Sequence, residues 1–229
     1  MTPKALLREI AGIWKTHLKM ASYHFFLVFH RPAEIIKDYN DDKKLGIDTL
    51  GWYFTKNDTS PYKDQYPANS LVHSELKQLM DSIKLGENDV FIDIGCGAGR
   101  VMAAVAAKRL KKVMGIEIEE RVVMRAKENA STLKVKNTDI EIFQADAGNF
   151  DYKGITVYFI NNPFGWKTLI KVRGAIKKSL EADPRKIRII YYGLYNAVFD
   201  MADWLNPEGK LGSSKFFEWR NILPSARNI

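Results

Sequence analysis

The chain has 229 residues, of which 46% are hydrophobic, and this length and composition suit one domain with a large core. Its single cysteine, Cys96, excludes an intramolecular disulfide and fits a reducing compartment, so we expect a cytoplasmic protein. The formal net charge of +8 is uneven, with +2 over residues 1–60, zero over 61–150 and +6 over 151–229. The basic final third suits an acidic substrate or a membrane, or consists of solvated helix faces.

Residues 4–20 predict a basic amphipathic helix. At about 100° per residue, its lysine and arginine residues fall on one narrow face and its large apolar residues on the opposite face. The apolar run at 23–29 is far shorter than the ~20 residues that a bilayer span requires, which argues against a transmembrane anchor. We expect residues 4–29 either to lie peripherally on a membrane or to pack against the main domain or a dimer partner.

Residues 31–69 are polar and interrupted by proline and glycine, yet they contain too many aromatic residues for a disordered linker. A segment ordered over the mouth of a pocket explains this composition better, and we expect Tyr62 and Tyr66 to belong to a substrate lid. The chain is thereby expected to divide into a helical extension and lid segment, residues 1–69, and a main domain, residues 70–229. The first helix of that domain is expected to follow Ser70 as its capping residue.

A short apolar run, a glycine-rich turn and a helix follow one another between residues 90 and 110. Val90–Ile94 is mostly apolar and β-branched, which fits a strand buried on both faces, with Asp93 as its one charge. The next five residues read G-C-G-A-G, a turn that allows a ligand to approach the backbone closely. Arg100 opens an alanine-rich helix whose amide groups face that turn. Together these elements predict the first unit of a nucleotide-type α/β site.

The spacing of the glycines distinguishes between ligands. A turn that binds pyrophosphate has the pattern G-x-G-x-x-G, which would need glycine where Arg100 stands. The pattern here is D-x-G-x-G-x-G, and a carboxylate two residues before the first glycine suits a cation better than a diphosphate. It resembles motif I of class I methyltransferases, whose cofactor S-adenosylmethionine carries an ammonium and a sulfonium but no phosphate. The resemblance implies that this cofactor is bound by Asp93, Gly95, Cys96, Gly97 and Gly99.

Two further acidic residues end predicted strands. The strand at 112–118 carries Glu117 about 20 residues past the glycines, where a carboxylate can accept hydrogen bonds from both ribose hydroxyls. The strand at 140–146 ends at Asp146, which by the resemblance accepts a hydrogen bond from the adenine amino group. Ile118 and Ala147 complete the predicted cofactor site.

The turn after the predicted strand at 154–160 is where we expect the methyl acceptor, because it lies at the carboxyl end of a strand beside the first one. It reads N-N-P-F-G, and asparagine offers a carbonyl that can orient an amine or a hydroxyl. The turn resembles motif IV of amino-methyltransferases, (D/N)-P-P-(Y/F), with Asn162 in place of the first proline. It also resembles the asparagine pair of non-SET histone lysine methyltransferases and the N-P-F-G turn of uncharacterised bacterial methyltransferases. These resemblances imply catalytic positions at Asn161, Asn162, Pro163 and Phe164, with Asn161 also contacting the cofactor.

The last third of the chain continues the alternation of helices and strands. We predict a basic helix over 166–180, a strand over 186–192, a further helix over 196–205 and a sixth strand over 215–222. The family normally ends with a seventh, antiparallel strand. Because few residues follow, either that strand is very short or the sequence is truncated.

The resemblance to class I methyltransferases covers residues 70–229 and implies a doubly wound α/β fold. The expected sheet is mostly parallel and seven-stranded, in the order 3-2-1-4-5-7-6, with helices on both faces. The implied reaction is methyl transfer from S-adenosylmethionine to a nitrogen or oxygen acceptor, with no metal. Since the leaving group is already activated, holding donor and acceptor in line does most of the catalysis.

Three classes of acceptor remain open. A cell-envelope glycan or lipid-linked substrate fits the basic N-terminal helix and the basic final third, and is our first choice. A protein lysine fits the asparagine pair and Tyr66-Pro67, which is similar to a Y-x-P element of lysine methyltransferases. A nucleic acid fits the net charge, but the neutral middle third and the altered motif count against it. The non-enzyme alternative is a scaffold that binds S-adenosylmethionine without catalysis, and the intact N-N-P-F-G turn argues against it.

Overall fold

The computed structural model describes residues 32–50, 71–211 and 216–221. The chain divides into two compact units, Met1–Asp41 and Asp42–Ile229. The predicted helix at 4–20 and both predicted lid residues, Tyr62 and Tyr66, lie outside the described residues, as does the expected boundary after residue 69. None of the helices in the described part of the chain is long and apolar enough to cross a bilayer.

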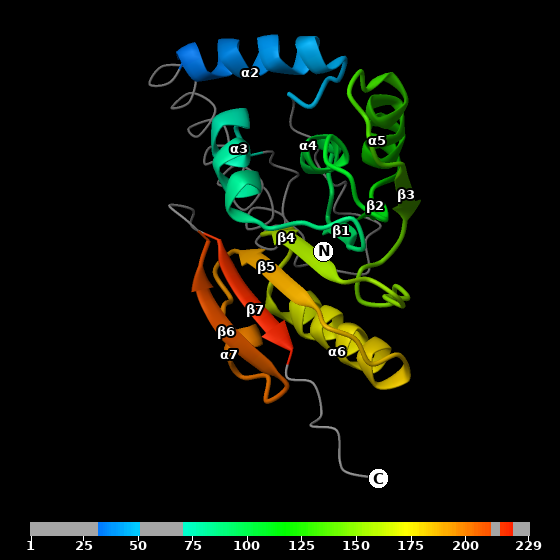
Figure 1. Ribbon diagram of the computed structural model, residues 1–229, viewed down its shortest axis with the longest axis vertical. Coiled ribbons are helices and arrows are strands. Elements are labelled where there is room, and N and C mark those ends of the chain that lie inside the picture. Colours follow the sequence, from blue (N-terminus) through cyan, green and yellow to red (C-terminus); the bar gives the residue numbers. More distant parts are fainter. Residues whose placement is uncertain (1–31, 51–70, 212–215, 222–229) are drawn as a thin grey trace, which may run out of the picture. The chain divides into compact units, whose positions relative to one another are not determined.

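Seven strands form one sheet in the order β3-β2-β1-β4-β5-β7-β6 (Figure 1). The first five are parallel, and β7 runs antiparallel to both of its neighbours. This confirms the predicted fold and strand order. The strand order reverses between β1 and β4, which places a ligand site at their carboxyl ends. The strands are β1 Val90–Ile94, β2 Lys112–Glu117, β3 Ile140–Gln144, β4 Val157–Asn161, β5 Arg188–Tyr192, β6 Leu205–Lys210 and β7 Phe217–Asn221.

Two predictions about the C-terminal part of the sheet are wrong. The helix predicted over 196–205 is wrong in extent, because α7 covers only Ala197–Asp200 and β6 begins at Leu205. The sequence of β6 contains Pro207 and Gly209, which are poor strand residues, and its pairing with β7 is irregular between them. The strand predicted over 215–222 is therefore the seventh strand and not the sixth, and the expectation of a very short final strand is wrong.

Two hydrophobic cores cover the two faces of the sheet. One lies between the sheet and α3, α4 and α5, and the other between the sheet and α6 and α7. Neighbouring strand residues point to opposite cores, as Phe91 and Ile92 do in β1. These helices are α3 His73–Ser82, α4 Arg100–Ala106, α5 Glu120–Thr132 and α6 Trp166–Ala182.

Helix α2, Pro32–Leu45, lies in the stretch 31–69, for which the sequence predicts an aromatic lid segment and no helix. Its charges complement the helix dipole, with Glu34 in the first turn and Lys43 and Lys44 in the last. Gly46 follows with φ of 78°, a conformation that ends many helices. The helix α3 begins at His73, slightly later than the predicted start after Ser70.

Candidate cofactor and acceptor site

The glycine-rich turn between β1 and α4 has a backbone that only glycine adopts readily. Gly95, Gly97 and Gly99 have φ angles of 75°, 53° and 90°. The amide groups of Gly95 and Cys96 donate to the carbonyl of Ile116 at 2.9 and 3.0 Å, which ties the turn to the end of β2. The predicted cofactor turn therefore lies at the carboxyl edge of the sheet.

Glu117, the last residue of β2, directs its carboxylate towards this turn. Its Oε2 accepts a hydrogen bond from the amide of Gly97 at 3.2 Å. Its Oε1 accepts hydrogen bonds from the amides of Ile118 and Glu119 at 2.8 and 3.2 Å. The structure thus brings Glu117 and Ile118 to the glycine turn, while the binding of ribose by Glu117 stays a prediction.

Two acidic groups lie close together under the turn. Burial, followed by the nearby charge of Glu117, raises the pKa of Asp93 to about 8. Burial also raises the pKa of Glu117, although hydrogen bonds from backbone amides act in the opposite direction. A cation bound here would stabilise both carboxylates, whereas a diphosphate would meet two acids. The electrostatics of the turn therefore favour a cationic ligand.

Cys96 lies in the turn as a buried thiol. Burial raises its pKa well above the ordinary value, and the charge of Asp93 acts in the same direction. A high pKa keeps the thiol protonated and unreactive at neutral pH. An ideal Cβ built on Gly115 would lie 3.0 Å from its sulfur, so this part of β2 is closely packed. Cys96 is therefore a packing residue whose backbone shapes the turn.

Asp146 follows β3 and organises the loop there. Its Oδ1 accepts a hydrogen bond from the amide of Gly148 at 2.9 Å. Ala147 is 9% exposed, and the amide of Ala145 donates to the carbonyl of Glu117 at 3.0 Å. The two acids predicted to bind ribose and adenine thus lie at the ends of neighbouring strands, because Glu117 is the last residue of β2 and Asp146 follows β3.

Gly95 and Pro163 bring the cofactor turn and the N-N-P-F-G turn together. An ideal Cβ built on Gly95 would collide with Cβ of Pro163 and lie 3.0 Å from its Cγ. Asn161 is the last residue of β4 and pairs with Tyr192 of β5. Phe164 is 6% exposed and packs in the core on the α6 side. The predicted donor and acceptor positions are therefore in contact through backbone and proline atoms.

Asn162 has the most unusual environment in this turn. It has φ of 46°, and it is the one non-glycine residue of the described ranges with a positive φ. Its Oδ1 is buried and has no hydrogen-bond partner within the described structure. An ideal Cβ on Gly193 would lie 2.9 Å from this oxygen, so Gly193 leaves it the space it occupies. A strained backbone and an unpaired buried acceptor are typical of functional sites.

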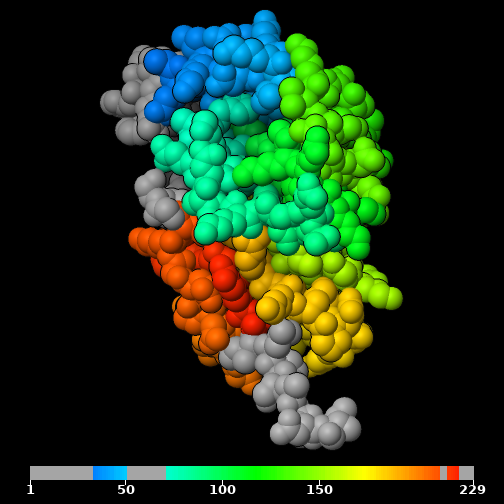
Figure 2. All heavy atoms as spheres, in the orientation of Figure 1, coloured from blue at the N-terminus to red at the C-terminus, as the bar shows by residue number. Residues whose placement is uncertain are grey.

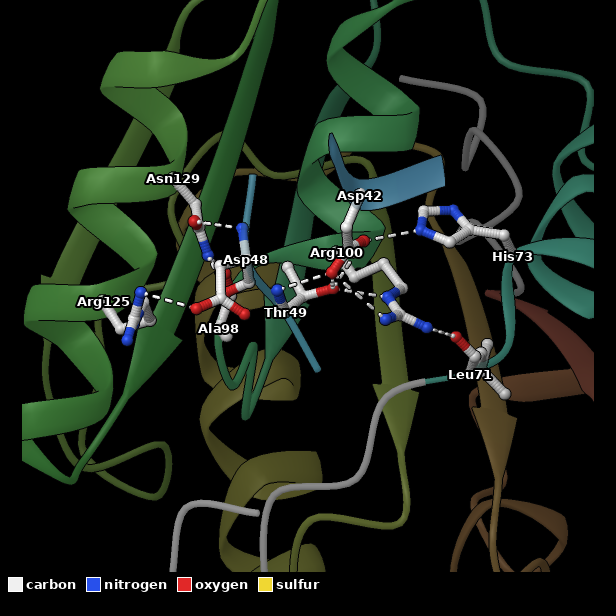
Figure 3. Close-up of polar contacts among 9 residues, drawn as sticks. All are labelled: Asp42, Asp48, Thr49, Leu71, His73, Ala98, Arg100, Arg125 and Asn129. Carbon is white, nitrogen blue, oxygen red and sulfur yellow. Dashed lines mark hydrogen bonds and ion pairs between the residues drawn. The ribbon is translucent and has the colours of Figure 1, made fainter. Parts of the chain in front are cut away.

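Figure 3 shows a buried polar cluster around Arg100, the residue that directly follows the glycine turn. The Arg100 guanidinium donates to Thr49 Oγ1 at 2.5 Å and to the Leu71 carbonyl at 2.8 Å, and pairs with Asp42 Oδ2 at 3.4 Å. The side chains of Arg100 and Asp42 are 2% and 3% exposed. His73 Nε2 lies 2.7 Å from Asp42 Oδ1. The Arg100 guanidinium thus binds Thr49, which precedes the stretch 51–70, and Leu71, which follows it.

Burial opposes ionisation of Asp42, but its partners outweigh that effect. The hydrogen bond with His73, the charge of Arg100 and the donors of Thr49 together hold the pKa of Asp42 below its usual value. Asp42 is therefore an ionised carboxylate inside the domain, balanced by the Arg100 cation. From the sequence, Arg100 is predicted to open a helix and to break a diphosphate pattern, but not to form a buried ion pair. The sequence feature that indicates such a buried role is a lone arginine at the start of an otherwise apolar, alanine-rich helix.

Asn129 of α5 forms a second link between the turn and the segment after α2. Its Nδ2 donates to the carbonyls of Asp48 and Ala98 at 2.9 and 2.8 Å. Its Oδ1 accepts a hydrogen bond from the amide of Asp48 at 2.8 Å. Because Ala98 belongs to the glycine turn, residues 48 and 49 are fixed directly against the predicted cofactor site.

The fold and these turns define a Rossmann-like α/β domain with a ligand site at the carboxyl ends of β1, β2 and β4. Residues 85–186 match a family model described as a methyltransferase domain. This matched part, slightly less than half of the chain, is therefore similar to methyltransferase domains, and the seven-stranded sheet around it has a Rossmann-like strand order. Membership of the branch with an N-P-F turn stays a prediction. Among the residues that the structure describes, no group of His, Cys, Asp or Glu could hold a metal ion.

Named relatives share parts of the chain. The rRNA N(6)-adenosine-methyltransferase metl-5 of Caenorhabditis elegans is 31% identical over 114 residues, which are 45% of this chain and 50% of that protein. A putative protein N5-glutamine methyltransferase of Methanocaldococcus jannaschii is 35% identical over 94 residues, 39% of this chain and 42% of that protein. The chain thus spans half or less of the length of these relatives.

The fold is similar to that of a ribosomal protein L11 methylase from Lactobacillus delbrueckii subsp. bulgaricus. The TM-score is 0.51 at 16% sequence identity, over 67% of this chain and 80% of that one. At this level of identity the likeness concerns the fold alone.

Proposed function

We propose that the protein is an S-adenosylmethionine-dependent methyltransferase that acts on a nitrogen or oxygen acceptor. The contact between Gly95 and Pro163 carries this proposal, because it joins the cofactor turn to the turn that bears Asn162. A methyl donor and its acceptor must meet within van der Waals distance and in line. Two adjoining turns at the carboxyl ends of neighbouring strands satisfy this requirement.

The residues at the glycine turn fit S-adenosylmethionine. Asp93 and Glu117 are acidic groups that favour a cation, and the cofactor carries an ammonium and a sulfonium. When bound, the cofactor supplies a methyl group on a sulfur that leaves as a neutral thioether. The glycine backbone and Asp93 would hold its amino-acid part, Glu117 the ribose, and Asp146 with Ala147 the adenine. The chain's own contribution is then to bind, orient and exclude water.

Asn162 is proposed to orient the acceptor. Its buried Oδ1 lacks a partner, and such an oxygen gains a hydrogen bond when an N–H or O–H group of the acceptor arrives. Accepting that hydrogen bond directs the lone pair of the attacking nitrogen or oxygen towards the methyl carbon. Asn161, at the end of β4, is proposed to lie on the cofactor side of the same turn.

We propose that the acceptor is a cell-envelope glycan or a lipid-linked molecule. The charge of +6 over residues 151–229 supports it, since the acceptor turn lies at the start of that stretch. A protein lysine is the alternative. Two relatives are named as methyltransferases of rRNA adenosine and of protein glutamine. The assay for the acceptor must therefore also include RNA and protein side-chain amides.

The proposal is tested by methyl transfer from radiolabelled S-adenosylmethionine to fractionated cell lysate, with lipid, glycan, protein and nucleic-acid pools counted separately. Calorimetry with S-adenosylhomocysteine and with NAD accompanies it. We expect S-adenosylhomocysteine to bind and NAD not to bind. Binding of NAD without any response to S-adenosylhomocysteine would overturn the proposal, and label in the protein or RNA pool would replace the glycan assignment. Cofactor binding without label in any pool would favour the non-catalytic scaffold.

Replacing Glu117 with alanine should weaken the binding of S-adenosylhomocysteine by roughly 1.5–3 kcal/mol, as expected for lost hydrogen bonds to a charged group. Calorimetry measures the change. Glu141→Ala is the control, since Glu141 is a solvent-exposed glutamate of the neighbouring strand β3 whose carboxylate pairs with Lys112 at 2.8 Å. Equal affinity of the Glu117 variant and the control would assign Glu117 a structural role only.

Replacing Asn162 with glycine should lower kcat at least tenfold, or about 1.4 kcal/mol of barrier, because the oriented acceptor oxygen is lost. Glycine is chosen because it tolerates φ of 46°, so the change removes the side chain without adding backbone strain. The affinity for S-adenosylhomocysteine should stay close to that of the parent. Asn161→Ala is measured beside it, and unchanged turnover in both variants would place the acceptor site elsewhere.

A further inference from the structure

Helix α6 has an exposed face that combines lysines with large apolar side chains. At about 100° per residue, Lys167, Lys171 and Lys178 fall within one narrow arc of the helix. Trp166 and Ile170, which are 50% and 39% exposed, lie along one side of that arc. The exposed positions of the helix hold four lysines and one glutamate, so the face is positively charged. The region around its C-terminal end is visible in gold at the lower right of Figure 2.

The apolar side of this face borders α7. Arg173 lies on the same side of α6 as Trp166, and its Nη1 donates to the carbonyl of Val198 in α7 at 2.6 Å. Leu194 precedes α7 and Met201 follows it, and each is 81% exposed. Large apolar side chains of α6, and of the residues that flank its neighbour α7, thus reach solvent.

This surface adjoins the predicted acceptor turn. Asn161 and Tyr192 are register partners, so β4 and β5 end at the same edge of the sheet. Trp166 opens α6 directly after the N-N-P-F-G turn, and Leu194 lies in the loop directly after β5. Anything that binds this surface is therefore held beside the acceptor site.

We propose that this surface, named the α6 face and made of Trp166, Lys167, Ile170, Lys178, Leu194 and Met201, docks the protein onto a lipid surface with anionic headgroups. The proposal rests on the proposed methyltransferase function and specifies where its acceptor is presented. Lysines attract anionic headgroups, and tryptophan and aliphatic side chains insert at the boundary between headgroups and acyl chains. An acceptor anchored in that lipid layer would then reach Asn162 without leaving the membrane.

The composition of the α6 face favours lipid over other partners. A protein interface core is typically depleted in lysine, and this face carries lysines beside its apolar residues. Single-stranded RNA is held by aromatic stacking platforms, whereas three of the four apolar residues here are aliphatic. The pairing of lysine with aliphatic side chains is typical of helices that lie in a membrane interface.

The test uses the full chain in sedimentation with phosphatidylcholine vesicles, with and without phosphatidylglycerol. The parent should bind only vesicles that contain phosphatidylglycerol, and less at high salt. The double variant K167E/K178E should bind about twenty-five-fold more weakly, at about fivefold for each lysine. W166A/L194A should lose binding to a similar degree. The control is M124A/K127E on α5, where Met124 is 65% exposed and Lys127 is also exposed; it should bind as the parent does.

Unchanged vesicle binding in both α6-face variants would overturn the proposal, even if the parent binds through other residues. Retention of single-stranded RNA that depends on Trp166, without vesicle binding, would overturn it in favour of a nucleic-acid surface. Affinity for S-adenosylhomocysteine is measured on each variant and shows whether it is folded. A parent that binds S-adenosylhomocysteine but no vesicles refutes the docking surface alone, whereas a parent that binds vesicles but no S-adenosylhomocysteine refutes the proposed function.

Discussion

Replacing Arg100 with methionine is expected to lower the free energy of unfolding by about 3–5 kcal/mol, the range for removing one partner of a buried ion pair. The reason is the Asp42 carboxylate, which is 3% exposed and would be left inside the domain without its cation. Thr49 and the Leu71 carbonyl would lose the same guanidinium. Methionine fills a similar volume, so the change isolates the charge and its hydrogen bonds. Urea unfolding measures the loss.

Arg125→Met is the matched control for Arg100. Its guanidinium pairs with Asp48 at 2.9 Å, but the two side chains are 34% and 57% exposed, so the loss should stay within about 1 kcal/mol. The double variant R100M/D42N should recover part of the stability that Arg100→Met loses, because the unpaired charge is then absent. Equal losses in the Arg100 and Arg125 variants would show that the buried pair does not stabilise the domain.

Replacing Gly95 with alanine is expected to destabilise the domain by roughly 2–5 kcal/mol and to abolish tight binding of the cofactor. A left-handed conformation costs a residue with Cβ about 1–2 kcal/mol, and Gly95 has φ of 75°. The new methyl group would also collide with Pro163, and such overpacking costs about 1–3 kcal/mol. Relief of the collision must separate the two turns that the proposed reaction needs side by side.

Gly154→Ala separates these two contributions. Gly154 has φ of 74°, nearly the same as Gly95, and an ideal Cβ there would meet no atom within 4 Å. Its substitution should therefore lower the free energy of unfolding only by the cost of the left-handed backbone, about 1–2 kcal/mol. The affinity for S-adenosylhomocysteine should stay unchanged. Unfolding curves and calorimetry on both variants provide the comparison. If both variants lose the same free energy of unfolding, Pro163 moves aside at little cost and does not fix the geometry of the site.

The five parallel strands and the place of the cofactor turn were predictable from local patterns in the sequence, whereas the order of the strands in the sheet followed only from the resemblance to class I methyltransferases. The buried strand Val90–Ile94 and the glycines after it identify the first β-turn-α unit, and the remaining strands follow by apolar runs of typical length. The pattern failed at β6, whose residues LNPEGK carry no apolar alternation and include a proline and a glycine. That strand forms because it pairs with β7 at the edge of the sheet, which is a tertiary effect.

The sequence by itself determined the residue types of the site, namely the glycines of the turn, the acids within β1, at the end of β2 and after β3, and the asparagine pair. Only the tertiary structure decided which of them carry unusual chemistry. Asn162 acquires a positive φ and an unpaired buried oxygen because β4, β5 and Gly193 enclose its turn. Arg100 becomes a buried anchor because the chain returns Asp42 to it from 58 positions away. Contacts between residues so far apart leave no periodic trace in the sequence, so packing alone reveals them.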